Sequence, residues 1–114
     1  MSDCLFCRIV AGELPSTEVA SSGHSYAFRD LHPVAPTHVL VVPKRHIDDA
    51  STVAPADGPV IADMLALARE VATAEGLGDK GYRLIFNVGE DSGNTVAHLH
   101  MHVIGGRPLG WPHG

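Results

Sequence analysis

The segment 98–104 reads His-Leu-His-Met-His-Val-Ile and holds the residues with the clearest chemical potential in this chain. If the segment is a β-strand, every second side chain shares a face, so His98, His100 and His102 lie together and the apolar residues point into a core. On a helix the same three rings would scatter around the cylinder. The alternation therefore predicts a strand that lays a row of imidazoles along the floor of a site.

One metal ion held by all three rings is disfavoured by their spacing. At about 3.3 Å per residue, the Cα atoms of His98 and His102 lie roughly 13 Å apart. Two imidazoles that bind one ion at about 2.0 Å barely bridge that distance. A three-histidine metalloenzyme of the cupin or carbonic anhydrase type is therefore a weak reading, and we expect the three rings to have different roles.

Covalent catalysis at phosphorus suits the central ring. A neutral imidazole is nucleophilic near neutral pH, so His100 could attack phosphorus and hold a phosphoryl or nucleotidyl group. The turn Gly93-Asn94-Thr95 offers backbone amides and a hydroxyl beside it. Such donors stabilise the charge that develops on phosphate oxygens in the transition state. The chemistry needs no metal at the reacting phosphorus.

Cys4 and Cys7 form a Cys-x-x-Cys pair on one face of a predicted N-terminal helix. A thioredoxin-like redox motif would follow a strand, and no strand is predicted before residue 4. Two readings remain open on the residues alone, namely half of a tetrahedral zinc site or two buried thiols.

Short apolar runs and turn residues predict an α+β fold with a mostly antiparallel sheet, a short N-terminal helix and one long helix packed on one face. The whole chain, 1–114, is interpreted as a single domain. The predicted elements are a helix over 4–10, a hairpin of strands 18–20 and 26–30, a strand over 38–42, a helix over 57–75, a strand over 82–88, a polar turn over 89–95 and the histidine strand over 98–104.

Composition limits the classes of partner. The net charge is −5 and Lys plus Arg total only 8, which argues against a nucleic-acid polymer but not against one small phosphate ligand. We find no apolar run long enough to span a bilayer, and the start Met1-Ser2-Asp3-Cys4 is not a secretory leader. With two cysteines and no export signal, a reducing cytoplasm is the expected location.

The segment 98–104 matches the histidine-triad signature, and the chain resembles the HIT family, in particular its branch of histidine triad nucleotide-binding proteins. The Gly105 to Pro112 tail resembles that branch and not the diadenosine-polyphosphate hydrolases. The further motifs that carry the resemblance are Phe6 and Ile9, Phe28-Arg29-Asp30-Leu31, Pro36-Thr37-His38, Pro43-Lys44-Arg45-His46, Gly81-Tyr82-Arg83 and Gly105-Gly106-Arg107 to Trp111-Pro112.

The resemblance implies a homodimer that binds purine nucleotides and hydrolyses nucleoside phosphoramidates to the monophosphate, without an organic cofactor. It implies His100 as the nucleophile, His102 as a phosphate contact, His38 beside the triad and Thr95 as a catalytic hydroxyl. Thr95 stands where the eukaryotic pattern has serine, which keeps the hydroxyl and adds a methyl.

The resemblance also assigns binding roles. Asp30 would accept the two ribose hydroxyls, and Trp111 would lie near the site of the partner subunit. Apolar side chains would form a slot for the base, and polar turn residues would frame the ribose and phosphate. The slot residues are Phe6, Ile9, Phe28 and Leu31, and the framing residues are Asn87, Gly93, Asn94, Thr95 and Val96.

Many bacterial members of the family bind structural zinc through two cysteines and two histidines, which here would be Cys4, Cys7, His46 and His98. The alternative is that His98 is only hydrogen-bonded, as in metal-free members. Other histidines match no motif: His24 and His32 are interpreted as exposed loop residues, and His113 lies in the tail.

Two other functions remain open on the sequence. One is a dinucleoside polyphosphate hydrolase that uses the same nucleophile. The other is a nucleotide-binding or scaffolding protein without catalysis, although a pure binder has no need of a nucleophile.

Overall fold

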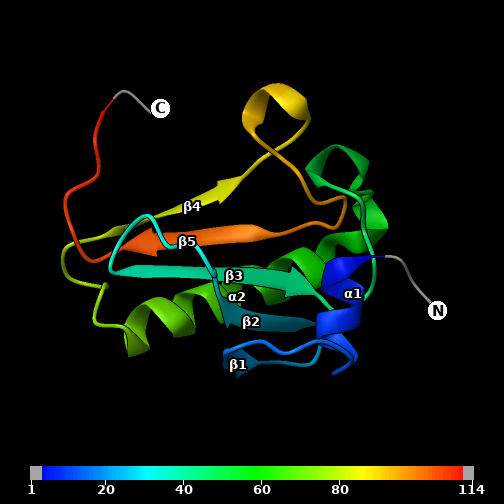
Figure 1. Ribbon diagram of the computed structural model, residues 1–114, viewed down its shortest axis with the longest axis horizontal. Helices are drawn as coiled ribbons and strands as arrows, with labels where there is room; N and C mark the ends of the chain where they lie inside the picture. The colour runs from blue at the N-terminus through cyan, green and yellow to red at the C-terminus, as the bar shows by residue number, and fades with distance from the viewer. Residues whose placement is uncertain (1–3, 112–114) are drawn as a thin grey trace.

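The computed structural model describes residues 4–111 and contains one antiparallel sheet within them, with strand order β1-β2-β3-β5-β4. Figure 1 shows the strands side by side, with the long helix behind the sheet and the short helix at one end. The elements are α1 (Leu5–Val10), β1 (Glu18–Ser21), β2 (Ser25–Arg29), β3 (Thr37–Pro43), the 3-10 turns Ala50–Thr52 and Pro55–Asp57, α2 (Gly58–Ala74), β4 (Tyr82–Phe86), the 3-10 turn Glu90–Ser92, and β5 (Met101–Gly105).

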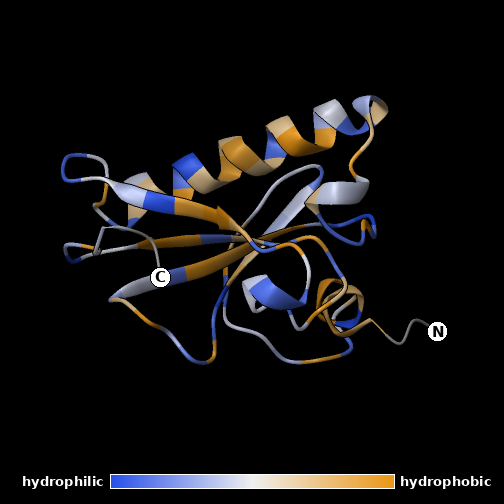
Figure 2. Ribbon diagram, turned by 90° about the horizontal axis from the view of Figure 1, so that it is seen from above, coloured by the Kyte–Doolittle hydropathy of each residue, from blue (hydrophilic) through white to orange (hydrophobic). Residues whose placement is uncertain are grey.

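The two faces of the sheet are covered differently, as the view from above shows (Figure 2). Val39 and Val41 of β3 and Met101 and Val103 of β5 pack against α2 in the main core. Because side chains alternate along a strand, the intervening residues face the opposite side. That side carries His38 and His102, and a second apolar cluster of Phe6, Phe28, Leu40 and Val42 forms there under α1. The sheet thus separates a core on one face from a site on the other.

The predicted α+β architecture is confirmed, including the antiparallel sheet and both helices. The prediction of a strand over 98–104 is wrong at its start, since β5 begins at Met101 and His98 lies in a bend. The β3–β5 pairing ends at Val41 and Met101. Before that point the backbone leaves the ladder, because the Leu99 N–H donates to the Ile47 carbonyl at 2.6 Å.

Alternation of the side chains continues through the unpaired residues nevertheless. Leu99 is buried in the core under α2, whereas the rings of His98, His100 and His102 follow one another on the other side. The strand predicted over 82–88 is also shorter than expected, because β4 ends at Phe86. In the described part of the chain, neither helix is long and apolar enough to cross a membrane.

The β1–β2 hairpin is held onto α2 by one carboxylate. Asp63 accepts hydrogen bonds from Ser22 Oγ at 2.6 Å, Ser25 Oγ at 2.8 Å and the His24 backbone N–H at 3.1 Å. These bonds, led by that from Ser22, hold the pKa of Asp63 below its ordinary value of 3.8 although burial opposes them.

We expect Asp63→Ala to lower the free energy of unfolding by about 2 kcal/mol at pH 7. Because the pKa of Asp63 is depressed in the folded state, its contribution is complete above pH 3.8 and is lost as the pH falls through the lower folded value. Urea unfolding of both proteins at pH 7 and at pH 3 measures this. A difference that grows on acidification would contradict the assignment.

Candidate active site

Three edge-on ring contacts among Phe6 and the histidines define the floor of the site. The ring centroids of His100 and His102 lie 5.2 Å apart, and Phe6 of α1 contacts His100 edge-on at 5.2 Å and His98 at 5.9 Å. His102 is positioned by β5, where it pairs with Leu40 of β3. The predicted row of imidazoles is therefore present, with a helix residue covering its first half.

The proton position on His100 follows from its backbone contact. Its Nδ1 lies 2.8 Å from the carbonyl oxygen of His98. A carbonyl can only accept, so Nδ1 carries the proton and donates it. In the neutral ring the Nε2 atom then bears the lone pair, which is the requirement for a nucleophile. The same carbonyl would stabilise the positive charge that the ring acquires after attack.

His38 and His102 form a hydrogen-bonded pair beside His100. His38 Nε2 lies 2.8 Å from His102 Nδ1 and 3.5 Å from Asp30 Oδ2. Burial lowers the pKa of His38, against the nearby carboxylate of Asp30, and burial with the neighbouring His100 and His38 lowers the pKa of His102 to about 4. Both rings are therefore neutral at pH 7, and each carries one proton.

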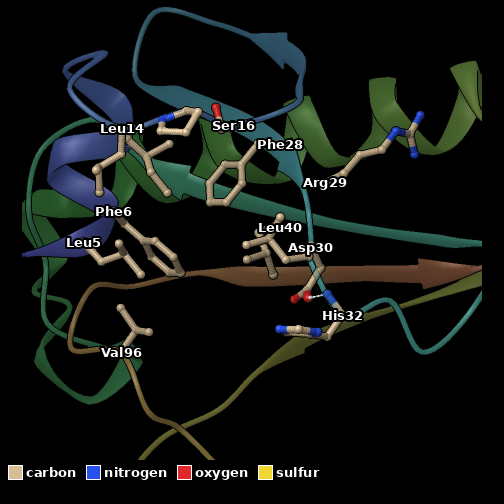
Figure 3. Close-up of a pocket in the computed structure, with 13 residues that line it drawn as sticks. Leu5, Phe6, Leu14, Ser16, Phe28, Arg29, Asp30, His32, Leu40 and Val96 are labelled. Atoms are coloured by element: carbon tan, nitrogen blue, oxygen red, sulfur yellow. Dashed lines mark hydrogen bonds between the residues drawn. The ribbon is translucent and has the colours of Figure 1, made fainter.

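An apolar cavity of about 390 Å³ opens on the side of Phe6, the residue that also contacts His98 and His100. Figure 3 shows Phe6, Phe28 and Leu40 in its wall, with the Asp30 carboxylate at one end and Arg29 pointing away. Arg29 instead forms a bidentate ion pair with Glu75 at 2.8 and 3.2 Å. The cavity lining contains every residue that was assigned to the base slot and two others with binding roles: Phe6, Ile9, Phe28, Leu31, Asp30 and Val96.

The remaining predicted binding residues shape the turn before the histidines and do not line this cavity. Asn87 Nδ2 donates to the Ser92 carbonyl at 2.9 Å, and Asn94 Oδ1 accepts from the Val96 N–H at 3.1 Å. Gly93 has a φ of 84°, a left-handed conformation that favours glycine. Thr95 is exposed and lies in a separate hollow with Cys4, His46 and Ala97.

Sequence reasoning missed part of the cavity wall. Leu5, Leu14, Ser16 and Leu40 line it, and so does His32, which was interpreted only as an exposed loop residue. His32 is exposed, and its backbone N–H donates to Asp30 Oδ1 at 2.8 Å. The Asp-x-His spacing that permits such a turn was the available signal. His24 is exposed on the hairpin, and His113 lies outside the described residues.

A second cluster brings together the four residues assigned to zinc. Cys4 Sγ and Cys7 Sγ lie 3.2 and 3.4 Å from His98 Nδ1, and Cys7 Sγ lies 3.4 Å from His46 Nδ1. The four ligand atoms all lie within 4.8 Å of one another. Cys4 also caps α1, since the Cys7 N–H points at its sulfur at 3.4 Å. The short helix therefore presents both sulfurs to the two imidazoles.

The hydrogen bonds of the outer nitrogens leave the inner nitrogens of the two histidines, the Nδ1 atoms, as possible metal ligands. His98 Nε2 donates to the Pro43 carbonyl at 3.0 Å, and His46 Nε2 donates to Asp48 Oδ1 at 2.7 Å. Burial lowers the pKa of His98, so its ring is neutral. The two Nδ1 atoms then lie 3.2 Å apart with their lone pairs facing each other and the two cysteine sulfurs, an arrangement that a bound cation would stabilise. The donor set fits tetrahedral zinc, with N–N and S–N separations near those that Zn–N and Zn–S bonds of about 2.0 and 2.3 Å produce.

The fold and the site define a small α+β protein that places a row of histidines near an apolar pocket and a carboxylate. Residues 11–109 match the HIT domain family model. The chain is 41% identical over 112 residues to an uncharacterised HIT-like protein of Synechocystis, which covers 98% of this chain and 97% of that protein. The chain therefore belongs to the HIT family.

Solved structures agree with this assignment. A HIT family hydrolase from Legionella pneumophila superposes with a TM-score of 0.96 at 46% identity, covering 98% of this chain and 100% of that one. A histidine triad nucleotide-binding protein from Candida albicans superposes with a TM-score of 0.82 at 29% identity, covering 98% and 85%. The expected HIT fold is thereby confirmed over nearly the whole chain.

Proposed function

We propose that this protein hydrolyses purine nucleoside phosphoramidates to nucleoside monophosphates through a covalent nucleotidyl-His100 intermediate. The observation that carries the proposal is the His100 Nδ1–H bond to the His98 carbonyl at 2.8 Å, which leaves a lone pair on Nε2 of a ring in contact with Phe6, a residue of the pocket wall. The names of the two structural relatives, a hydrolase and a nucleotide-binding protein, support the reaction class and the ligand class.

The reaction proceeds in two displacements. His100 Nε2 attacks phosphorus with its lone pair, and a bond from Nε2 to phosphorus forms. The bond from phosphorus to the substrate nitrogen breaks, and the amine takes a proton from solvent as it leaves. His102, neutral above about pH 4, would donate to a phosphate oxygen and stabilise its charge. Water then attacks phosphorus and releases a proton to solvent, while the bond from phosphorus to Nε2 breaks. Its electron pair returns to Nε2, so the monophosphate leaves and the neutral His100 ring is restored.

Zinc would be held by Cys4, Cys7, His46 and His98, away from the reacting phosphorus. Its contribution when bound is structural, because it fixes the His98 ring and with it the backbone carbonyl that orients His100. The pair His38 and His102, together with Asp30, also places three ligand atoms within 4.8 Å of one another. There His38 Nε2 and His102 Nδ1 are hydrogen-bonded to each other at 2.8 Å, so this pair of nitrogens is already satisfied without a metal.

Ribose recognition by Asp30 gives a direct test of the binding mode. The carboxylate already accepts from the His32 N–H and retains lone pairs for two hydroxyls. We expect the wild-type protein to prefer a ribonucleoside phosphoramidate over its 2′,3′-dideoxy analogue by about 30-fold in kcat/KM, from hydrogen bonds to a charged acceptor.

In Asp30→Ala this preference should disappear, because the two ribose hydroxyls then have no carboxylate to which they can donate. His32→Ala, which retains the backbone N–H to Asp30, serves as the control and should retain the preference. If Asp30→Ala and the wild type show the same ratio of kcat/KM for the two substrates, Asp30 does not bind the ribose.

Substrate class is tested by comparing adenosine phosphoramidate with diadenosine triphosphate and tetraphosphate. We expect turnover of the phosphoramidate to exceed that of both polyphosphates. A large preference for the polyphosphates would instead assign the protein as a dinucleoside polyphosphate hydrolase.

A homodimer is part of the proposal, on the resemblance to the family. In the described residues, β4 is an edge strand of the sheet, and Leu84 on it is 39% exposed. Trp111 in the tail is also exposed. A residue that contacts a partner subunit is expected to be exposed when one chain is considered alone. Light scattering should give twice the chain mass of 12.0 kDa.

A further inference from the structure

The segment that follows β5 is fastened to the loop that precedes β3. Arg107 Nη2 donates to the Val34 carbonyl at 2.8 Å. Gly106 has a φ of +96°, and a Cβ added there would lie 2.8 Å from Pro36 Cβ. The tail therefore approaches the loop 33–36 so closely that glycine is required at the crossing. Arg107 itself is exposed and lines neither the cavity nor the histidine row.

The same loop residue determines where His38 carries its proton. The Val34 backbone N–H donates to His38 Nδ1 at 3.2 Å. Because an N–H can only donate, Nδ1 is unprotonated and the proton of the neutral ring lies on Nε2. That proton is donated to His102 Nδ1 at 2.8 Å. His102 Nδ1 is in turn unprotonated, and the remaining proton of His102 lies on Nε2, the only ring nitrogen left for a phosphate.

We propose that Arg107 is a positioning residue which, by holding Val34, fixes the tautomers of His38 and His102 so that His102 presents an N–H to the substrate phosphate. Val34 joins the tail to the site by hydrogen bonds, as it accepts from Arg107 and donates to His38. In the opposite tautomer His102 would point a lone pair at a phosphate oxygen, which is repulsive. The role at phosphate rests on the proposed function, whereas the tautomers are a property of the protein alone.

Imidazole ¹⁵N NMR of the uniformly labelled protein at pH 7 reads the tautomers directly. In the wild type we expect separate protonated and unprotonated nitrogen signals for His38 and His102, with Nδ1 unprotonated in both. In Arg107→Met each ring should exchange between its two tautomers, so its two nitrogen signals should move toward the mean of the protonated and unprotonated shifts. Arg107→Lys, which keeps a donor, should restore the separation in part. Unchanged signals in a folded Arg107→Met protein would overturn the proposal.

Arg83→Met provides the matched control. Arg83 also donates from its guanidinium to a tail carbonyl, that of Gly110, but it has no connection to Val34. We expect its nitrogen signals for His38 and His102 to match the wild type. If Arg83→Met shifts the nitrogen signals of His38 and His102 as much as Arg107→Met does, any loosening of the tail is sufficient to change the tautomers. That result would overturn the specific role of Arg107.

Val34→Pro removes the N–H donor itself while Arg107 stays in place. It should shift the same two rings as Arg107→Met, and the double variant should shift them no further. Turnover of adenosine phosphoramidate should fall about fivefold in each, the equivalent of one hydrogen bond, with partial recovery in Arg107→Lys. If the wild type does not hydrolyse phosphoramidates, the proposed function fails while the NMR result still decides the role of Arg107.

Discussion

Replacing His100 by alanine is expected to reduce turnover of adenosine phosphoramidate by four orders of magnitude or more. The variant lacks the atom that forms the bond to phosphorus, and loss of a nucleophile has effects on the order of 10⁴ to 10⁶ in enzymes that use one. The half-buried His100 ring contacts Phe6 and His102. Steady-state kinetics with the released amine as the readout measures the loss.

Binding of the product monophosphate separates catalysis from occupancy in this variant. The apolar cavity and Asp30 remain intact in His100→Ala, so calorimetry should find adenosine monophosphate bound within a few-fold of the wild-type affinity. A variant that binds and turns over as the wild type does would identify the protein as a nucleotide binder without histidine-based catalysis.

Loss of the metal is expected to have the second large effect, on stability. The protein purified without chelator should hold one zinc per chain. His46→Ala removes one ligand and leaves His98 Nδ1 without its partner across the ion. We expect zinc content well below one and a loss of about 3 kcal/mol, which lowers the Tm by roughly 15 °C in a domain of this size.

His24→Ala is the control for this change. His24 is also an exposed histidine beside a strand, and its hydrogen bond to Asp63 comes from its backbone N–H, which alanine retains. Its zinc content and Tm should match the wild type. Wild-type protein with little zinc and a Tm insensitive to dipicolinate would favour the alternative that His98 is only hydrogen-bonded.

The sequence predicts those features of the fold that follow from the spacing of apolar and polar residues within one segment. Alternation over 98–104 places Leu99, Met101 and Val103 on the core side and the rings on the other, and helical spacing places α2 within one residue at each end. The start of β5 is different, because it depends on the distant Ile47 carbonyl that takes the Leu99 N–H. Nothing in the histidine segment itself encodes that partner.

In the site, too, some features follow from local spacing and others depend on contacts between distant segments. The Cys-x-x-Cys spacing indicates two sulfurs on one helix face, but only the resemblance joined them to His46 and His98, which the structure brings together. Leu14 and Ser16 line the cavity because the chain after α1 folds back over Phe28, a tertiary contact without a local signature. The link from Arg107 through Val34 to His38 spans 73 residues at its first step and is likewise invisible to spacing arguments.

Trapping the covalent intermediate tests the central claim most directly. Wild-type protein is mixed with excess adenosine phosphoramidate, quenched with alkali, in which a phosphorus–histidine bond survives, and measured by intact mass and peptide mapping. We predict an adenylyl adduct on His100 that disappears as substrate is exhausted and is absent from His100→Ala. An adduct on another residue, or rapid turnover with no adduct at any time, would contradict the account.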